Sequence, residues 1–210
     1  MKKPKDFNNS ILAKHSSITL EGTNNTLYQM AITPPIIDKK TIFMDSLKGA
    51  LGIPNHINNW YELKVNFGVY ERLFQMTIIS LCSDIEFMFK ELFADIQPNQ
   101  TYNLGFYQRF KEVIKTLKKL NFDFNDIQTD LENINKSFQI RHISIHNMGY
   151  VDESIKNKID TEYQIDEHYL VTSGEYQEIF ESYGNFLKSL DDNLSKIANK
   201  QYVLLCFLVS

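Results

Sequence analysis

The sequence predicts an all-α protein, built as an antiparallel bundle of about four main helices with an extended or β-hairpin-like arm at the N-terminus. From about residue 57 onward, apolar residues recur at three- and four-residue steps, as they do along one face of a helix. The stretch from 58 to 94 contains no proline and a single glycine. Before residue 55, by contrast, turn-forming residues are frequent, as in Asn8-Asn9-Ser10, Gly22-Thr23-Asn24-Asn25 and Pro34-Pro35.

Length and composition limit the domain organisation. The chain has 210 residues, of which 43% are hydrophobic, so it can bury a sizeable core. We expect an N-terminal extension over 1–55, a helical domain over 56–200 and an apolar C-terminal tail over 201–210. The net charge of -4 argues against a protein that coats nucleic acid by bulk charge, but it permits a local basic site.

The sequence also predicts a cytoplasmic protein without membrane contact. The basic N-terminus is not followed by the apolar segment of a signal peptide, and the apolar runs at 76–82 and 202–209 are too short to span a bilayer. Cys82 and Cys206 lie in apolar runs far apart in the sequence, so we expect two buried free thiols in a reducing compartment.

In the arm, Ser17 to Glu21 and Leu27 to Thr33 resemble short strands, and Asp45 to Leu51 predicts one or two helical turns ended by Gly52 and Pro54. In the helical part, the segment from Met76 to Phe93 is apolar on nearly every face, which predicts a central helix packed on several sides.

Three further helices are predicted at about 106–120, 126–147 and 174–199. The first carries Phe110, Val113, Leu117 and Leu120 on one face and Lys111, Lys115, Lys118 and Lys119 on another. Such a lysine face is usually an ordinary solvated surface. It becomes an electrostatic guide for a polyanion if it borders a binding site.

The helix over 126–147 contains the most informative motif. Its apolar stripe runs through Ile127, Leu131, Ile134 and Phe138, and the next members of the stripe are Arg141 and Ile145. A polar stripe of Asn135, Gln139, His142 and His146 lies beside it. Because burying a guanidinium without a partner is costly, Arg141 needs an anion. In a structural reading, the partner is a carboxylate of the same chain, such as Glu86 or Asp84. In a functional reading, it is a substrate phosphate or an acceptor group of a second subunit. The register gives these two readings equal weight.

Other chemistries fit the sequence less well. His142 and His146 have a spacing that can bind zinc, but the only candidates for a third ligand are Asp152, Asp166 and His168, so no metal site is predicted. Ser144 lacks the glycine-flanked turn of a nucleophilic serine, and the chain contains no glycine-rich phosphate loop.

The motif Arg141-His142-x-x-x-His146-Asn147-x-Gly149-x-x-Asp152 resembles the signature of HEPN domains, the higher eukaryotes and prokaryotes nucleotide-binding helical family. In that family an Arg precedes a His by four to six residues, often with a polar residue directly after the Arg. The central helix, with Asp84 and Glu86 inside an apolar run, is similar to the first long HEPN helix. The resemblance covers about residues 60 to 195 and is closest to small prokaryotic HEPN proteins of the defence and toxin type.

The resemblance implies a metal-independent endoribonuclease without a cofactor. It acts as a homodimer whose two motifs face each other across a cleft. His146 is the expected general acid or base on the ribose 2′-hydroxyl, and Arg141 stabilises charge on the phosphoryl oxygens. The resemblance also implies that His142 assists protonation or phosphate contact and that Asn147 orients His146 or the phosphate. From the lysine face we expect Lys111, Lys115 and Lys118 to bind the substrate, and we expect Glu86 and Asp84 to be structural or orienting residues.

The expected products are a 2′,3′-cyclic phosphate and a 5′-hydroxyl, which requires RNA as the substrate. A toxin or antiphage effector, with an antitoxin or defence-system partner, is the cellular role that this resemblance implies. One alternative is a non-catalytic HEPN-like module that binds a nucleotide or a protein. Another is a helical interaction subunit in which Arg141 is only ion-paired. The presence of both Arg141 and His146 favours the enzyme.

Overall fold

A computed structural model describes residues 11–31, 42–66, 69–103, 105–158 and 162–208. Their helices are α1 (Ile11–Ala31), α3 (Asp45–Leu51), α4 (Trp60–Asn66), α5 (Val69–Ile96), α6 (Phe110–Lys119), the 3-10 turn η2 (Asn125–Ile127), α7 (Gln128–His146), α8 (Glu153–Lys156) and α9 (Ser173–Leu208). Within these ranges the β-type pairings are two isolated bridges and no strand forms. The predicted all-α class is confirmed.

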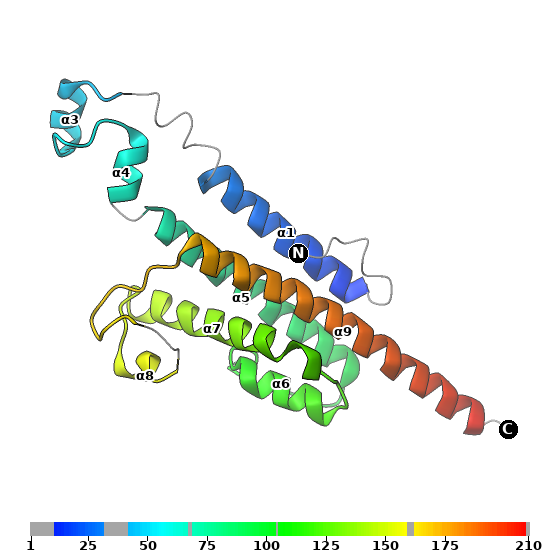
Figure 1. The fold of residues 1–210 in the computed structure, drawn as a ribbon. Helices are drawn as coiled ribbons and strands as arrows, with labels where there is room; N and C mark the ends of the chain where they lie inside the picture. Colours follow the sequence, from blue (N-terminus) through cyan, green and yellow to red (C-terminus); the bar gives the residue numbers. More distant parts are fainter. Residues whose placement is uncertain (1–10, 32–41, 67–68, 104, 159–161, 209–210) are drawn as a thin grey trace.

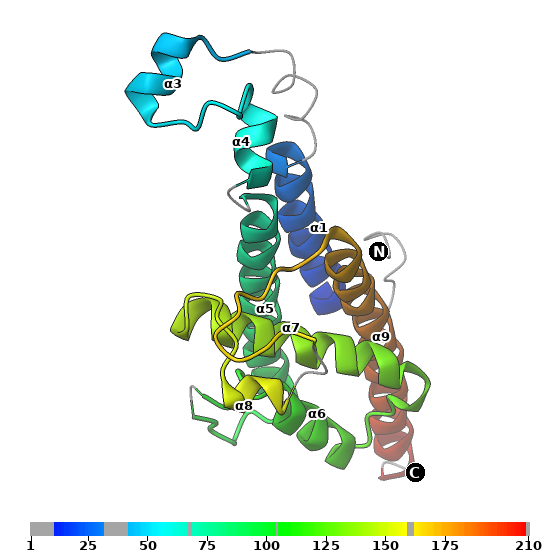
Figure 2. The same cartoon turned by 60° about the vertical axis from the view of Figure 1, so that its left-hand side comes forward.

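Helix α5 is the centre of the bundle. Helices α1, α4, α7 and α9 all pack against it, and α7 also packs against α6 and α9 (Figure 1). Figure 2 shows α7 crossing α5 and α9. The ring of Phe89 on α5 lies 6.1 Å from that of Phe110 on α6 and 5.9 Å from that of Phe186 on α9, measured between centroids. The predicted central helix, packed on several sides, is therefore confirmed.

The predicted extended or hairpin-like arm is wrong for the residues that the structure describes. Residues 17–21 and 27–31 belong to α1, which packs along α5 and α9. The buried face of α1 includes Ala13, Ser17, Leu20 and Asn24, which have helical spacing. Thr23 Oγ1 donates to Asp84 Oδ2 of α5 at 3.1 Å, and Tyr176 of α9 donates to Asn24 Oδ1 at 3.0 Å. These long-range contacts stabilise a helix whose own sequence favours turns.

Other parts of the predicted arm and tail have mixed outcomes. The short helix before Gly52 forms as predicted, and Gly52 ends it in the left-handed conformation, with φ 65°. Residues 8–10, 32–33 and 34–35 lie outside the described residues. At the other end of the chain, the backbone of residues 201–208 continues α9. None of the helices in the described ranges combines the length and hydropathy that crossing a bilayer requires.

The turn after α7 fixes how this helix ends. Gly149 has φ 92°, and its N–H donates to Ile143 O at 2.9 Å, which closes the last turn of α7. Its own carbonyl accepts from the Tyr169 N–H at 2.8 Å, and Tyr169 O accepts from Gln75 Nε2 of α5 at 2.5 Å. The C-terminal end of α7 is therefore tied to α5 through this loop.

Replacing Gly149 with Ala should destabilise the fold by about 2 kcal/mol, because a left-handed backbone disfavours a side chain. The added Cβ would also lie 2.7 Å from His168 Nε2. Gly174→Ala is the matched control, since a Cβ there meets nothing within 4 Å. Urea unfolding should show a lower midpoint for the Gly149 variant alone; equal midpoints for the two variants would contradict this account of the turn.

Candidate functional site

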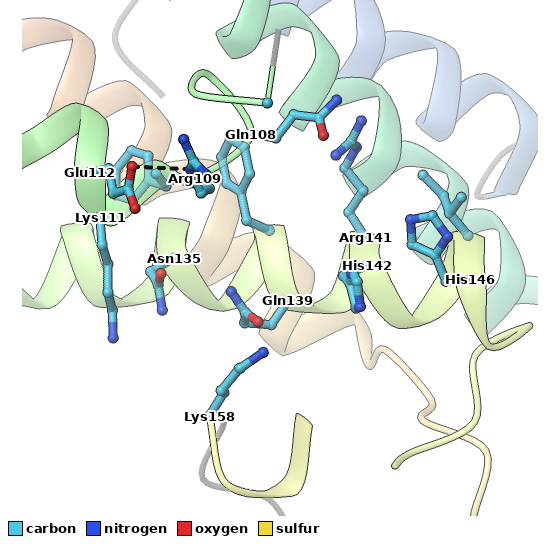
Figure 3. A pocket seen from close by; sticks show the side chains of 14 residues that line it. Gln108, Arg109, Lys111, Glu112, Asn135, Gln139, Arg141, His142, His146 and Lys158 are labelled. Carbon is cyan, nitrogen blue, oxygen red and sulfur yellow. Dashed lines mark ion pairs between the residues drawn. The ribbon is translucent and has the colours of Figure 1, made fainter. Parts of the chain in front are cut away.

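A cavity of about 770 Å³ opens between α6, α7 and the segment that follows α8 (Figure 3). All four members of the polar stripe predicted on α7 line it, namely Asn135, Gln139, His142 and His146. Arg141 and Ile145, the last two members of the apolar stripe, line it as well. The stripe that sequence periodicity identified is therefore one wall of a concave site.

Arg141 is ion-paired inside the protein. Its Nη1 lies 3.1 Å from Glu86 Oε1 of α5, and the two side chains are 18% and 10% exposed. Glu86 was one of two partners that the register suggested for Arg141. The other, Asp84, accepts from Thr23 on α1 instead. The structure thus brings Glu86 to the motif and places Asp84 at the contact between α5 and α1.

The hydrogen bonds of this pair are incomplete. Burial raises the pKa of Glu86, while the nearby charges of Arg141 and Lys90 and a hydrogen bond from Gln108 act in the opposite direction. Neither Glu86 Oε1 nor Arg141 Nε, both buried, has a hydrogen-bond partner. The pair is therefore held by charge without full hydrogen-bond alignment, and the buried Nε–H donor of the guanidinium is left unsatisfied.

A buried polar cluster lies one helical turn before this pair along both α5 and α7. Ser137 and Tyr183 share a hydrogen bond of 2.7 Å, and Cys82 Sγ lies 3.5 Å from each of their hydroxyl oxygens. Cys82 precedes Glu86 by four residues on α5, and Ser137 precedes Arg141 by four on α7. The cluster thus joins α5, α7 and α9 at a fixed register.

The thiol in this cluster has no evident reactive role. Burial raises the pKa of Cys82 to about 11, so it stays protonated and unreactive at neutral pH. Cys82 is a buried free thiol, as predicted. The side chain of Cys206 lies outside the described part of the chain.

The two histidines of the motif form a pair. The ring centroids of His142 and His146 are 4.8 Å apart, with their planes at 51°. Burial lowers the pKa of His142, and the neighbouring His146 and Lys158 lower it further, against the opposing effect of Asp152. His142 is therefore mostly neutral at pH 7, as a proton acceptor must be.

Asn147 shapes the turn after α7. Its Nδ2 donates to Asp152 Oδ2 at 2.5 Å, and Asp152 Oδ1 caps α8 by accepting from the Ile155 N–H at 2.8 Å. These hydrogen bonds lower the pKa of Asp152. Asn147 thereby fixes α8, and with it the segment that carries Lys158 to the cavity.

The lysines predicted to bind substrate differ in position. Lys111 lines the cavity, Lys118 lines an adjoining one, and Lys115 lines neither. Sequence reasoning missed Lys158 and Gln108, which lie in connecting segments without periodicity. For Lys158, the sequence offered one signal, namely that Asp152 lies close to the turn at Gly149 and so marks a connecting segment near the motif. Among the described residues, no three His, Cys, Asp or Glu side chains gather as metal ligands.

Comparison of the chain with models of protein families, with curated proteins and with solved structures finds no match.

Arg141→Met should lower the free energy of unfolding at pH 7 by about 2 kcal/mol, because it leaves Glu86 buried without its counter-charge. Loss of Arg141 also raises the folded-state pKa of Glu86 further above its unfolded value, so the folded state binds the extra proton. The deficit relative to wild type should therefore shrink as the pH falls toward about 5 and grow as it rises.

Urea unfolding across this pH range measures the effect. Arg141→Met combined with Glu86→Gln is the control, since it removes both charges and should cost less than Arg141→Met alone. A deficit that is independent of pH, or a double variant as unstable as the sum of its singles, would refute the coupling of the two charges.

His146→Ala should raise the pKa of His142, because it removes a neighbouring imidazole that lowers it. NMR titration of the His142 ring proton measures this without any assay of activity. His56→Ala, at an exposed position outside the cavity, should leave the His142 titration unchanged. An unchanged His142 titration in the His146 variant would show that the two rings are not coupled.

Proposed function

We propose that this chain is a metal-independent endoribonuclease with a HEPN-like catalytic arrangement. The observation that carries the proposal is that the paired rings of His142 and His146 line one cavity with the guanidinium of Arg141. RNA cleavage by its own 2′-hydroxyl needs one proton acceptor, one proton donor and stabilisation of charge on phosphorus-bound oxygens. These three side chains are able to supply all three.

In the proposed reaction, one neutral imidazole takes the proton from the 2′-hydroxyl as its oxygen attacks the adjacent phosphorus. Arg141 stabilises the negative charge that grows on the non-bridging oxygens. The bond from phosphorus to the 5′-oxygen breaks, and the second ring, which begins the step as an imidazolium, gives its proton to that oxygen and becomes neutral. The products are a 2′,3′-cyclic phosphate and a 5′-hydroxyl. The lowered pKa of His142 suits the accepting role, and His146 in its protonated form is then the donor to the 5′-oxygen.

In this proposal Glu86 is a positioning residue. It holds the guanidinium by charge at the edge of the cavity, and the buried Arg141 Nε remains without a hydrogen-bond partner. Asn147 acts through Asp152 and the turn, because its amide nitrogen already donates to that carboxylate.

The active form in this proposal is a homodimer. Ile145, which continues the apolar stripe of α7, is 48% exposed, and Met148 and Tyr150 beyond it are 74% and 49% exposed. Large apolar side chains beside a polar cavity are typical of an interface. A two-fold axis there would bring two copies of the cavity together. A toxin or antiphage effector, held in check by an antitoxin or defence-system partner, is the cellular role we propose.

A non-catalytic HEPN-like module that binds a nucleotide or a protein is the second candidate. The ion pair between Arg141 and Glu86 favours it, because an arginine already neutralised by the protein can serve stability alone.

The test is cleavage of a mixed RNA pool in the presence of EDTA. We expect wild type to cut, with cyclic-phosphate ends, and His146→Ala, His142→Ala and Arg141→Ala to lose at least about 100-fold in rate. His56→Ala and Arg72→Ala, which change residues outside the cavity, should cut like wild type. A folded wild-type protein that cuts no RNA would support the binding module and overturn the enzyme.

A further inference from the structure

We propose that the groove between α6 and α7 is a track for single-stranded RNA that binds the phosphates flanking the one that reacts. This inference rests on the proposed function, which supplies RNA as the polyanion and a reacting phosphate at the histidine pair. Its evidence is a second cavity, of about 690 Å³, that lies along the same two helices. Phe110, Lys111, Asn135 and Lys158 line both cavities, so the two adjoin along one groove.

The joined groove concentrates positive charge. Six cationic side chains and two carboxylates line it, whereas the whole chain has a net charge of -4. The cations are Arg109, Lys111, Lys118, Lys136, Arg141 and Lys158, and the carboxylates are Glu112 and Glu132. A groove whose charge opposes that of the molecule attracts polyanions while the remaining surface repels them.

Not all of these cations are equally available. Arg109 is paired with Glu112 at 3.0 Å, and Lys136 with Glu175 at 2.6 Å. In the described part of the chain, no ion pair engages Lys111 or Lys118, and Lys158 Nζ donates to the neutral hydroxyl of Ser154 at 2.9 Å. These three lysines are therefore the groups best able to bind phosphates without breaking an existing pair.

Their arrangement follows a path. Figure 3 shows Lys111 extending from α6 and Lys158 extending from the opposite side, with Asn135 and Gln139 of α7 between them. Lys118 lies in the second cavity, farther from the histidine pair along α6. A strand that leaves the histidines thus passes between two lysines at the junction of the cavities and then meets a third. The amides between them can bind sugars or base edges.

The reaction chemistry selects a single strand. In-line attack requires the 2′-oxygen to lie opposite the leaving 5′-oxygen, and a regular A-form duplex does not hold them so. A groove with lysines on both sides also suits one backbone better than two. We therefore expect single strands to bind more tightly than duplexes.

The experiment measures binding of fluorescent 2′-O-methyl oligoribonucleotides, which lack the attacking hydroxyl and so report on the track without catalysis. Lys118→Ala and Lys115→Ala are the matched pair, because the residues share α6 but only Lys118 lines the groove. We expect Lys118→Ala to weaken binding of a dodecanucleotide about fivefold and to reduce the slope of log affinity against log salt by about 0.7, as loss of one phosphate contact predicts. Lys115→Ala should change the affinity less than twofold.

Length and competitors complete the test. Lys111→Ala and Lys158→Ala should weaken binding of both the dodecanucleotide and a trinucleotide, whereas Lys118→Ala should affect the longer probe alone. Equal losses for Lys115 and Lys118, equal binding of duplex and single strand, or equal displacement by poly-glutamate would each overturn the track. Because these probes are not cleaved, a failed cleavage assay with intact length-dependent binding would reject the catalytic proposal and keep the groove as a binding track for RNA phosphates.

Discussion

The contact on which the site depends is the ion pair between Arg141 of α7 and Glu86 of α5. Along the apolar stripe of α7, Phe138 precedes Arg141 and is 4% exposed, whereas Ile145 follows it and is 48% exposed. The ion pair therefore lies at the boundary between the core and the surface. The charge of Glu86 offsets the cost of placing a guanidinium on an apolar stripe. Together with the Cys82–Ser137–Tyr183 cluster one turn below, it fixes the rotation of α7 about its own axis. That rotation directs the neighbouring polar stripe into the cavity.

The turn after α7 has the complementary role of bringing distant residues to the same cavity. Gly149 allows the chain to reverse, Asn147 binds Asp152, and Asp152 caps α8. Lys158 then reaches the groove from the side opposite α6. The loop thus brings Lys158 and Asp152 close enough to His142 to act on its pKa, in addition to the larger effects of burial and of His146.

Periodicity in the sequence was sufficient where a helix face is set by its own residues. The apolar stripe of α7 and the polar stripe beside it follow from a repeat of 3.6 residues, and the central position of α5 follows from apolar residues on nearly every face. Helix α1 could not be predicted in this way. Its buried face includes Ser17 and Asn24, and its Thr23 and Asn24 form hydrogen bonds with side chains of α5 and α9. For the same reason Gln108 and Lys158 were missed, because tertiary contacts and not local pattern bring them to the site.

Arg141 can both stabilise the fold and bind a ligand, but these two roles place different demands on the hydrogen bonds between Arg141 and Glu86. A pair retained only for stability gains most from aligned, charge-assisted hydrogen bonds that satisfy both partners. Here Arg141 Nε and Glu86 Oε1 both lack such partners, although they are buried. The same guanidinium lines a cavity with two imidazoles, in a groove with an excess of positive charge. We propose that Arg141 serves both roles: the buried side of its ion pair with Glu86 anchors α7, and its place at the edge of the groove makes it available to an anionic ligand.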